Sequence, residues 1–249
     1  MRNALGSSGR ERLVALMAER VLVGFDFDGT LVALSEHPNE VGLTAHTRAL
    51  LTRLAERVPV VVITGRSRAD VTGRLEGVPL FGIAGNHGVE PFGESPEVIA
   101  LVAEWHESLL RDLSKRPGVG IEDKRFSLTV DYRHAPDLEA TREAIQAAAK
   151  RLPHARLLGG RHADFNIAPE HAPNKGTALD AFMKQANCTA AIYVGDDRTD
   201  EDAFRLDLAA FAAIRVGRRE HSAAPFFLEA QTETDRLIEL LLEAVAARP

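Results

Sequence analysis

The chain has 249 residues, of which 45% are hydrophobic and 27% charged, the composition of an ordinary folded protein with a sizeable core. A formal net charge of -6 argues against a nucleic-acid binder that uses a broad basic surface. The single cysteine, Cys188, excludes an internal disulfide and a cysteine-rich zinc site, and is typical of a reducing compartment. Because we find no bilayer-length apolar run and no signal-peptide pattern, we expect a cytoplasmic protein without a membrane partner.

The first part of the chain alternates continuous apolar runs with amphipathic segments. After a flexible lead-in at residues 6–9 and a short helix to about residue 19, we expect strands at 21–25, 58–63 and 80–84, and helices at 44–57 and 67–75. The apolar runs have the character of strands buried on both faces. Their alternation with helices predicts a parallel sheet covered by those helices.

A different pattern occupies residues 94–169. We expect helices at 96–116 and 136–152, and strands at 119–122, 126–132, 155–158 and 164–168. The order of one helix, two strands, one helix and two strands (αββαββ) predicts a compact α+β unit in which neighbouring strands run antiparallel.

The first pattern then returns, with helices expected at 176–186, 200–208 and 233–247 and strands at 190–194 and 211–216. We therefore predict an α/β fold with a Rossmann-like parallel-sheet core. Residues 1–93 and 170–249 form this core, and residues 94–169 form an inserted α+β cap domain.

Two aspartates directly follow the first predicted strand. Asp26 and Asp28 are two residues apart, so in extended backbone their carboxylates point to the same side. Like charges so placed repel each other unless a cation or a proton lies between them, and carboxylate oxygens suit a hard cation such as Mg²⁺. An isolated Asp-x-Asp motif is more often a pair of solvated turn residues, so the motif alone leaves both interpretations open.

Two further signals follow a strand or begin a helix. Thr64, Gly65 and Arg66 come directly after the second predicted strand, where a hydroxyl and free amides could bind an anion or simply cap the next helix. Lys175 begins a predicted helix, although the helix dipole makes a cation unfavourable there. This lysine could hold a phosphate oxygen, or it could be an ordinary surface residue.

An acidic cluster follows the strand at 190–194. Some of its acids are expected at a helix N-terminus, but Asp196, Asp197 and Asp200 are also candidates for the cation that Asp26 requires. Each of the four polar clusters follows an apolar strand or begins a helix. A parallel sheet brings such chain positions together at one edge, so we expect the clusters to converge.

In this order, the clusters resemble the motifs of the haloacid dehalogenase (HAD) superfamily of phosphotransferases. A cap between Thr64 and Lys175 is typical of members that hydrolyse small phosphorylated sugars. Within the superfamily, the chain is similar to the trehalose-6-phosphate phosphatases. The segments that carry this similarity are 82–90, 121–124, Ser127, Tyr132-Arg133, 174–179 and 195–201.

The resemblance implies a Mg²⁺-dependent phosphatase that converts trehalose 6-phosphate to trehalose and phosphate through an aspartyl-phosphate intermediate. The implied catalytic residues are Asp26 as nucleophile, Asp28 as acid and base, and Thr64 and Lys175 as partners of the phosphoryl oxygens. The implied metal-site residues are Asp26, Asp28, Asp196, Asp197 and Asp200. The implied substrate-binding residues are Asp28, Gly29, Thr64, Gly65, Arg66, Asn86, His87, Glu122, Lys124, Asn166 and Lys175.

The chain departs from the family pattern at several positions. Asn166 and Ala168 stand where the family usually has a glutamate and an arginine, and Phe27 and Asp131 replace family tyrosine or histidine positions. Because that glutamate contacts sugar hydroxyls in the family, another glycosyl phosphate stays open as the substrate.

For four of the implied substrate-binding residues, a purely structural or solvent-exposed role also stays open. Glu122 and Lys124 could form a solvated charged turn, His87 could be structural, and Arg66 could be a salt-bridged scaffold residue.

Two functions of other classes are disfavoured. A non-catalytic sugar-phosphate sensor predicts the loss of Asp26, Asp28 or Lys175, and all three are present. A dinucleotide-binding dehydrogenase predicts a Gly-x-Gly-x-x-Gly turn after the first strand, and none is found there. We expect a monomer that acts on a small phosphorylated sugar and has no nucleic-acid partner.

Overall fold

The computed structural model describes residues 1–35, 37, 40–159 and 163–247, and the chain divides into two compact units. Unit 1 comprises Met1–Gly88 and Asn174–Pro249, and unit 2 comprises Val89–Pro173. No helix in the described ranges is both long enough and apolar enough to cross a membrane.

Unit 1 is built on a parallel sheet, which has seven strands in the described part of the chain, in the order β1-β11-β10-β9-β2-β3-β4. The strands are β1 (Arg2–Asn3), β2 (Val21–Phe25), β3 (Val60–Ile63), β4 (Gly82–Ala84), β9 (Ala190–Gly195), β10 (Phe211–Val216) and β11 (Phe226–Leu228). Strands β2, β3, β9 and β10 are almost entirely buried, as their largely apolar sequences predict.

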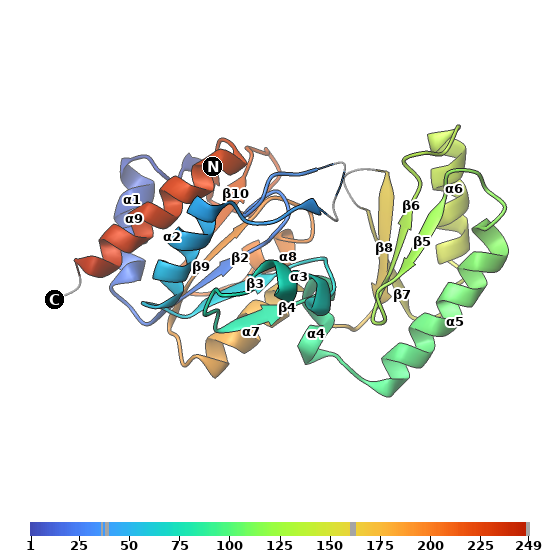
Figure 1. Cartoon of the computed structure of the whole chain (residues 1–249), viewed down its shortest axis with the longest axis horizontal. Coiled ribbons are helices and arrows are strands. Elements are labelled where there is room, and N and C mark those ends of the chain that lie inside the picture. The colour runs from blue at the N-terminus through green and yellow to red at the C-terminus, as the bar shows by residue number, and fades with distance from the viewer. Residues whose placement is uncertain (36, 38–39, 160–162, 248–249) are drawn as a thin grey trace. The chain divides into compact units, whose positions relative to one another are not determined.

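Helices cover both faces of this sheet. They are α1 (Ser7–Met17), α2 (Ala45–Ala55), α3 (Arg68–Arg74), η2 (Asn86–Gly88), α7 (Lys175–Gln185), α8 (Glu201–Phe204), η3 (Gln231–Glu233) and α9 (Thr234–Ala246). Figure 1 shows α1, α2 and α9 together over one face, where their apolar residues share a core with Val21, Val23 and Phe25 of β2. On the other face, a Cβ at Gly24 would lie 3.1 Å from Leu179 of α7, so the glycine permits close packing.

Unit 2 contains an antiparallel sheet, four-stranded in its described residues, in the order β5-β6-β8-β7. Its elements are α4 (Val89–Phe92), α5 (Pro96–Leu113), β5 (Gly120–Asp123), β6 (Leu128–Asp131), α6 (Leu138–Ala149), β7 (Ala155–Gly159) and β8 (Asp164–Pro169). Alternate strand residues, among them Leu128, Val130 and Ile167, pack with α5 and α6 in one core. Trp105 of α5 belongs to this core and donates a hydrogen bond to the Pro153 carbonyl at 3.1 Å.

The predicted α/β class, with a parallel sheet and a separate αββαββ unit, is confirmed. Two local predictions are wrong. Residues 7–9 of the expected lead-in already belong to α1, with Gly6 as the N-cap. Gly9 lets this first turn approach Ala4, whose carbonyl oxygen would lie 2.3 Å from an added Cβ. The helix expected at 200–208 is only the four-residue α8.

The strand order places the polar clusters at a topological switch point. Strand β2 lies between β3 and β9, and the chain continues from β2 towards β3 but from β9 towards β10. Phe25 and Val194 are register partners, so Asp26 and Gly195 lie side by side at this end of the two strands. In open parallel sheets, ligands bind beyond such paired carboxyl ends.

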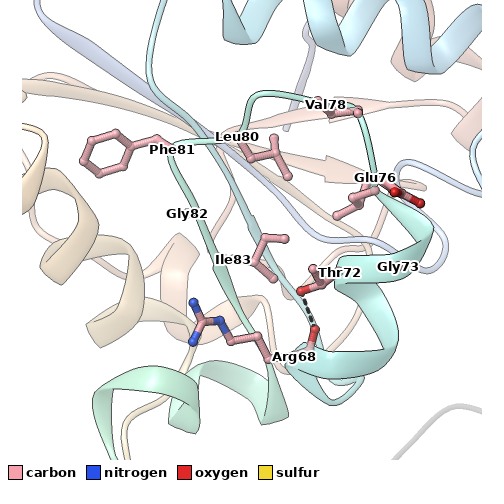
Figure 2. Close-up of a pocket in the computed structure, with 11 residues that line it drawn as sticks. Arg68, Thr72, Gly73, Glu76, Val78, Leu80, Phe81, Gly82 and Ile83 are labelled. Atoms are coloured by element: carbon pink, nitrogen blue, oxygen red, sulfur yellow. Dashed lines mark hydrogen bonds between the residues drawn. The ribbon is translucent and has the colours of Figure 1, made fainter.

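A separate pocket of about 630 Å³ lies at the edge strand β4. Figure 2 shows Leu80 and Ile83 pointing into the space between this edge and α3, with Arg68 at one side. Its lining includes none of the aspartates of the polar clusters.

Candidate active site

Asp26 is the first residue after β2 and is only 4% exposed. Its amide donates a hydrogen bond to the Val194 carbonyl of β9 at 2.8 Å, which continues the sheet ladder into the site. The chain then turns sharply, and Gly29 adopts a φ of +82° that favours glycine. A Cβ at this position would lie 2.2 Å from Oδ2 of Asp196, so the glycine also leaves room for that carboxylate.

Lys175 bridges two aspartates from distant parts of the chain. Its Nζ donates hydrogen bonds of 2.8 Å to Oδ1 of Asp26 and 2.8 Å to Oδ1 of Asp200, and its side chain is 2% exposed. Burial lowers the pKa of Lys175, but Asp200 and Asp26 outweigh that effect and hold the pKa above the ordinary lysine value. These two carboxylates explain why a cation is stable at the first position of α7, which Asn174 caps.

Asp200 organises the acidic loop after β9 through both of its carboxylate oxygens. Oδ1 accepts hydrogen bonds from Lys175 and from the Tyr193 hydroxyl, each at 2.8 Å. Oδ2 accepts from the amides of Asp196 at 2.9 Å and Asp197 at 2.8 Å. Since its two oxygens already accept four hydrogen bonds, Asp200 is suited to supporting a metal site rather than to being its principal ligand.

Three buried carboxylates converge at this edge of the sheet. One oxygen each from Asp26, Asp196 and Asp200 lie within 4.8 Å of one another. Burial is the main cause that raises the pKa of Asp26, Lys175 opposes it, and Asp200 and Asp196 add to the rise. These three carboxylates, two of which share the Lys175 ammonium group, offer oxygen donors that fit a hard divalent cation such as Mg²⁺.

The turn after β3 is tied to the turn after β4. Thr64 is buried, and its Oγ1 accepts a hydrogen bond from the Arg66 amide at 3.1 Å. The His87 amide donates to the Thr64 carbonyl at 2.8 Å, and the Asn86 amide donates to the Arg66 carbonyl at 2.8 Å. A Cβ at Gly65 would lie 2.5 Å from the His87 ring, so His87 is packed tightly against this turn.

Asp28 is held by Arg66. Nε and Nη2 of Arg66 each donate a 2.7 Å hydrogen bond to a different oxygen of the Asp28 carboxylate, and Nη1 donates to Asp70 at 2.8 Å. Burial lowers the pKa of Arg66, but its hydrogen bonds to Asp28 and Asp70 hold the pKa above the ordinary arginine value. The buried ring of Phe27 lies 5.6 Å from the guanidinium carbon, so this departure from the family pattern packs under Arg66.

The remaining predicted substrate-binding residues lie in unit 2. Glu122 of β5, Thr129 of β6 and Asn166 of β8 form one cross-strand row, on the sheet face opposite to α5 and α6. Oδ1 of Asn166 accepts a hydrogen bond from the Thr129 hydroxyl at 2.7 Å. Lys124 follows β5, and its Nζ lies 3.9 Å from Oε2 of the exposed Glu122.

The structure thus brings Asp26, Lys175, Asp196 and Asp200 into one cluster within unit 1. Two members of this neighbourhood, Tyr193 and Arg215, were missed in the sequence. Burial and the nearby Asp200 raise the pKa of Tyr193 well above the ordinary tyrosine value, so its hydroxyl stays a donor. The signal in the sequence is a polar side chain inside an otherwise apolar strand, which requires a buried partner.

Comparisons of the sequence and of the structure with known proteins point to the same family. Residues 24–229 match the trehalose-phosphatase family. A trehalose-phosphate phosphatase of Mycobacterium avium is 38% identical, over 73% of this chain and 50% of that protein. The solved C-terminal domain of a C. albicans trehalose-6-phosphate phosphatase is 20% identical with a TM-score of 0.79, over 98% of both chains.

A HAD superfamily phosphatase from Bacteroides thetaiotaomicron has a TM-score of 0.63 at 15% identity, over 91% of this chain and 96% of that one, which shows the same fold. The chain spans about half the length of the curated relatives that it matches. The family match covers most of the chain, and we conclude that this protein belongs to the trehalose-phosphatase family and has the HAD fold.

Proposed function

We propose that the chain is a Mg²⁺-dependent phosphatase that hydrolyses trehalose 6-phosphate to trehalose and phosphate. The observation that carries the proposal is the buried Asp26–Lys175–Asp200 arrangement, with Asp196 beside it, at the switch point of the sheet. A structural ion pair alone does not require three carboxylates so close together. Membership of the trehalose-phosphatase family supports the substrate.

In the first step, a carboxylate oxygen of Asp26 attacks phosphorus in line with the departing sugar oxygen and forms an aspartyl-phosphate. Asp28 donates a proton to the sugar oxygen as the bond between phosphorus and that oxygen breaks. In the second step, Asp28 takes a proton from the water that attacks phosphorus, which releases phosphate and regenerates Asp26. Mg²⁺ held by Asp26, the Asp28 carbonyl and Asp196 would supply positive charge opposite the phosphoryl oxygens.

The other residues of unit 1 hold the phosphoryl group and keep the nucleophile in place. The Thr64 hydroxyl, the Lys175 ammonium group and backbone amides near Gly29 and Gly65 donate to the phosphoryl oxygens. Lys175 also fixes one oxygen of Asp26, as its 2.8 Å hydrogen bond supports. Asp200 acts behind the metal ligands by accepting hydrogen bonds from the amides of Asp196 and Asp197, and we assign Asp197 a supporting role in the same loop.

The sugar is recognised by polar side chains that offer hydrogen bonds to hydroxyl groups. We assign this role to Glu122, Lys124 and Asn166 of unit 2, with Asn86 and His87 next to the phosphoryl-binding turn. Asn166 favours a second candidate function, hydrolysis of another glycosyl phosphate, because an amide offers a donor where the family's glutamate offers only acceptors. A cytoplasmic location and a monomeric state stay predictions from the sequence.

The decisive experiment measures phosphate release from trehalose 6-phosphate and a panel of sugar phosphates, with Mg²⁺ and with a chelator. Wild-type turnover should require Mg²⁺, and Asp26→Asn should lower it by roughly a thousandfold or more while the fold is kept. The matched control is Asp180→Asn, which removes an exposed carboxylate paired with Lys184 on α7 and should leave turnover unchanged. Unchanged turnover in Asp26→Asn would refute the nucleophile, and a tenfold preference for another sugar phosphate would refute trehalose 6-phosphate.

A further inference from the structure

Strand β10 contains one buried charge, Arg215, which has partners in the acidic loop and in α8. Arg215 is 3% exposed and lies between Ile214 and Val216 in an otherwise apolar strand. A buried guanidinium is costly unless it is paired and hydrogen-bonded. Arg215 is the register partner of Gly195, the residue directly before Asp196, so its side chain is level with the start of the acidic loop.

The guanidinium of Arg215 binds the backbone of the acidic loop. Nη1 donates to the Asp197 carbonyl at 3.1 Å, and Nη2 donates to the Asp196 carbonyl. The amides of the same two residues donate to Asp200. The peptide groups that carry Asp196 and Asp197 are therefore fixed at their amides by a carboxylate and at their carbonyls by a guanidinium.

Glu201 completes the arrangement. Its Oε1 lies 3.3 Å from Nη1 of Arg215, and its Oε2 accepts a hydrogen bond from the Ala223 amide at 2.8 Å. Glu201 therefore fixes the guanidinium and also ties it to the segment before β11. Glu201 is the first residue of the four-residue α8, a position where an acid is favourable without any of these contacts. Its burial therefore indicates a role other than stabilising the helix N-terminus.

We propose that Arg215 is a positioning residue that, with Glu201, holds the Asp196–Asp197 loop in the geometry that binds the divalent cation. This inference rests on the proposed function, because it assumes that Asp196 is a ligand. Without a divalent cation, Asp196 lies beside the carboxylates of Asp26 and Asp200, whose charges Lys175 offsets only in part. A loop free to relax would therefore move Asp196 away from Asp26. A planar guanidinium can hold two carbonyls and a carboxylate together, whereas a lysine ammonium group on a flexible stem cannot reproduce this geometry.

The test measures Mg²⁺ binding to the full chain by isothermal titration calorimetry, without substrate. Arg215→Met should weaken Mg²⁺ binding and raise the dissociation constant by about tenfold or more. Arg215→Lys should raise it by an intermediate factor. Arg12→Met is the matched control, because Nη2 of Arg12 donates to the carbonyls of Ala209 and Phe211 at the opposite end of β10. This control should bind Mg²⁺ like the wild type. Hydrogen exchange of the metal-free proteins should be faster over residues 195–200 in Arg215→Met only.

The outcomes separate the two proposals. Wild-type protein that binds no Mg²⁺ would refute the proposed metal site and, with it, this role of Arg215. Wild-type binding together with equal dissociation constants and equal exchange in folded Arg215→Met would refute only the role of Arg215. If Arg215→Met does not fold, the Arg215→Lys variant tests the proposal instead. An unchanged Mg²⁺ dissociation constant in that variant refutes the proposal, and a larger one supports it.

Discussion

Arg66 and Asp28 form a two-pronged ion pair in which each oxygen of the carboxylate accepts one 2.7 Å hydrogen bond from the guanidinium. Such a pair fixes the plane of the carboxylate as well as its position. Arg66 is itself held by Asp70 of α3 at 2.8 Å, so the orientation of Asp28 is set from outside the loop that carries it. The contact supports a scaffold role for Arg66, in which it aims the proposed acid and base.

Arg66→Met should lower kcat by roughly tenfold to a hundredfold, because an acid that is no longer oriented transfers its proton less efficiently. KM should change less, since Asp28 is not expected to supply most of the binding free energy. Steady-state phosphate release gives both constants. Arg142→Met, which breaks the exposed pair with Glu139, is the control and should leave both unchanged. A normal kcat in a folded Arg66→Met protein would show that Asp28 needs no such support.

Gly29→Ala should destroy Mg²⁺ binding as well as lower stability. Gly29 and Gly77 share a φ of +82°, but only at Gly29 would an added Cβ meet a neighbour, Oδ2 of Asp196 at 2.2 Å. Gly77→Ala therefore measures the backbone penalty alone, about 1 kcal/mol, and should bind Mg²⁺ normally. Urea unfolding and calorimetric titration of both variants check the prediction. Equal Mg²⁺ affinity in the two variants would mean that the turn does not set the position of Asp196.

Lys175→Met should be strongly destabilising, by about 3–5 kcal/mol, because it leaves the buried carboxylates of Asp26 and Asp200 without their shared cation. Lys184→Met on the same helix breaks only an exposed pair with Asp180 and should cost less than about 1 kcal/mol. Urea unfolding gives both free energies. Mg²⁺ should recover part of the loss in Lys175→Met, and a similar loss in both variants would contradict the buried bridge.

Mg²⁺ should stabilise the protein more strongly as the pH rises. The pKa of Asp26 is raised above its ordinary 3.8, chiefly by burial and against the charge of Lys175. A raised pKa in the folded state means that the metal-free protein loses stability as the pH rises through that pKa, because the buried carboxylate becomes ionised. Mg²⁺ binds the ionised form and offsets the loss.

Thermal unfolding between about pH 4.5 and 8, with and without Mg²⁺, measures this effect at pH values above the ordinary aspartate pKa of 3.8. The rise in Tm caused by Mg²⁺ should grow with pH in the wild type and should be small at every pH in Asp26→Asn. A Tm rise that is independent of pH would show that Asp26 is ionised throughout this range.

The sequence predicts the long buried strands well, because an uninterrupted apolar run has few alternatives in a folded chain. Strands β2 and β10 have the bounds expected from the sequence, 21–25 and 211–216. Strands β1 and β11 have two and three residues, too short to give a periodic signal, and exist only because parallel neighbours pair with them.

The convergence of the polar clusters follows from strand order, which local patterns can suggest. Local patterns do not reveal which partner each side chain binds, because that depends on packing in three dimensions. Nothing near Lys175 in the sequence indicates that it bridges Asp26 and Asp200, and Asp28 does not indicate that Arg66 binds it. Arg215 could be suspected from its apolar strand, but its partners could not be named.

Asn166→Glu should shift the choice of sugar without affecting the chemistry at phosphorus. Asn166 accepts a hydrogen bond from Thr129 through Oδ1, so its amide nitrogen is directed away from that contact and can donate to a sugar hydroxyl. A glutamate keeps the acceptor but removes the donor. If Asn166 contacts the sugar, the ratio of kcat/KM between trehalose 6-phosphate and other glycosyl phosphates should change by about tenfold.

The matched control for this variant is Asp131→Asn, an exchange between a carboxylate and an amide on the same face of the sheet. Asp131 pairs with Arg133 at 2.7 Å and is not assigned to the sugar, so its replacement should leave the ratio unchanged. Because Asn166→Glu adds a negative charge and Asp131→Asn removes one, opposite shifts of similar size in the two variants would point to a general effect of charge on this sheet. An unchanged ratio in Asn166→Glu would instead remove Asn166 from the residues that recognise the sugar, and the specificity would have to come from Glu122, Lys124 or the turn at Asn86.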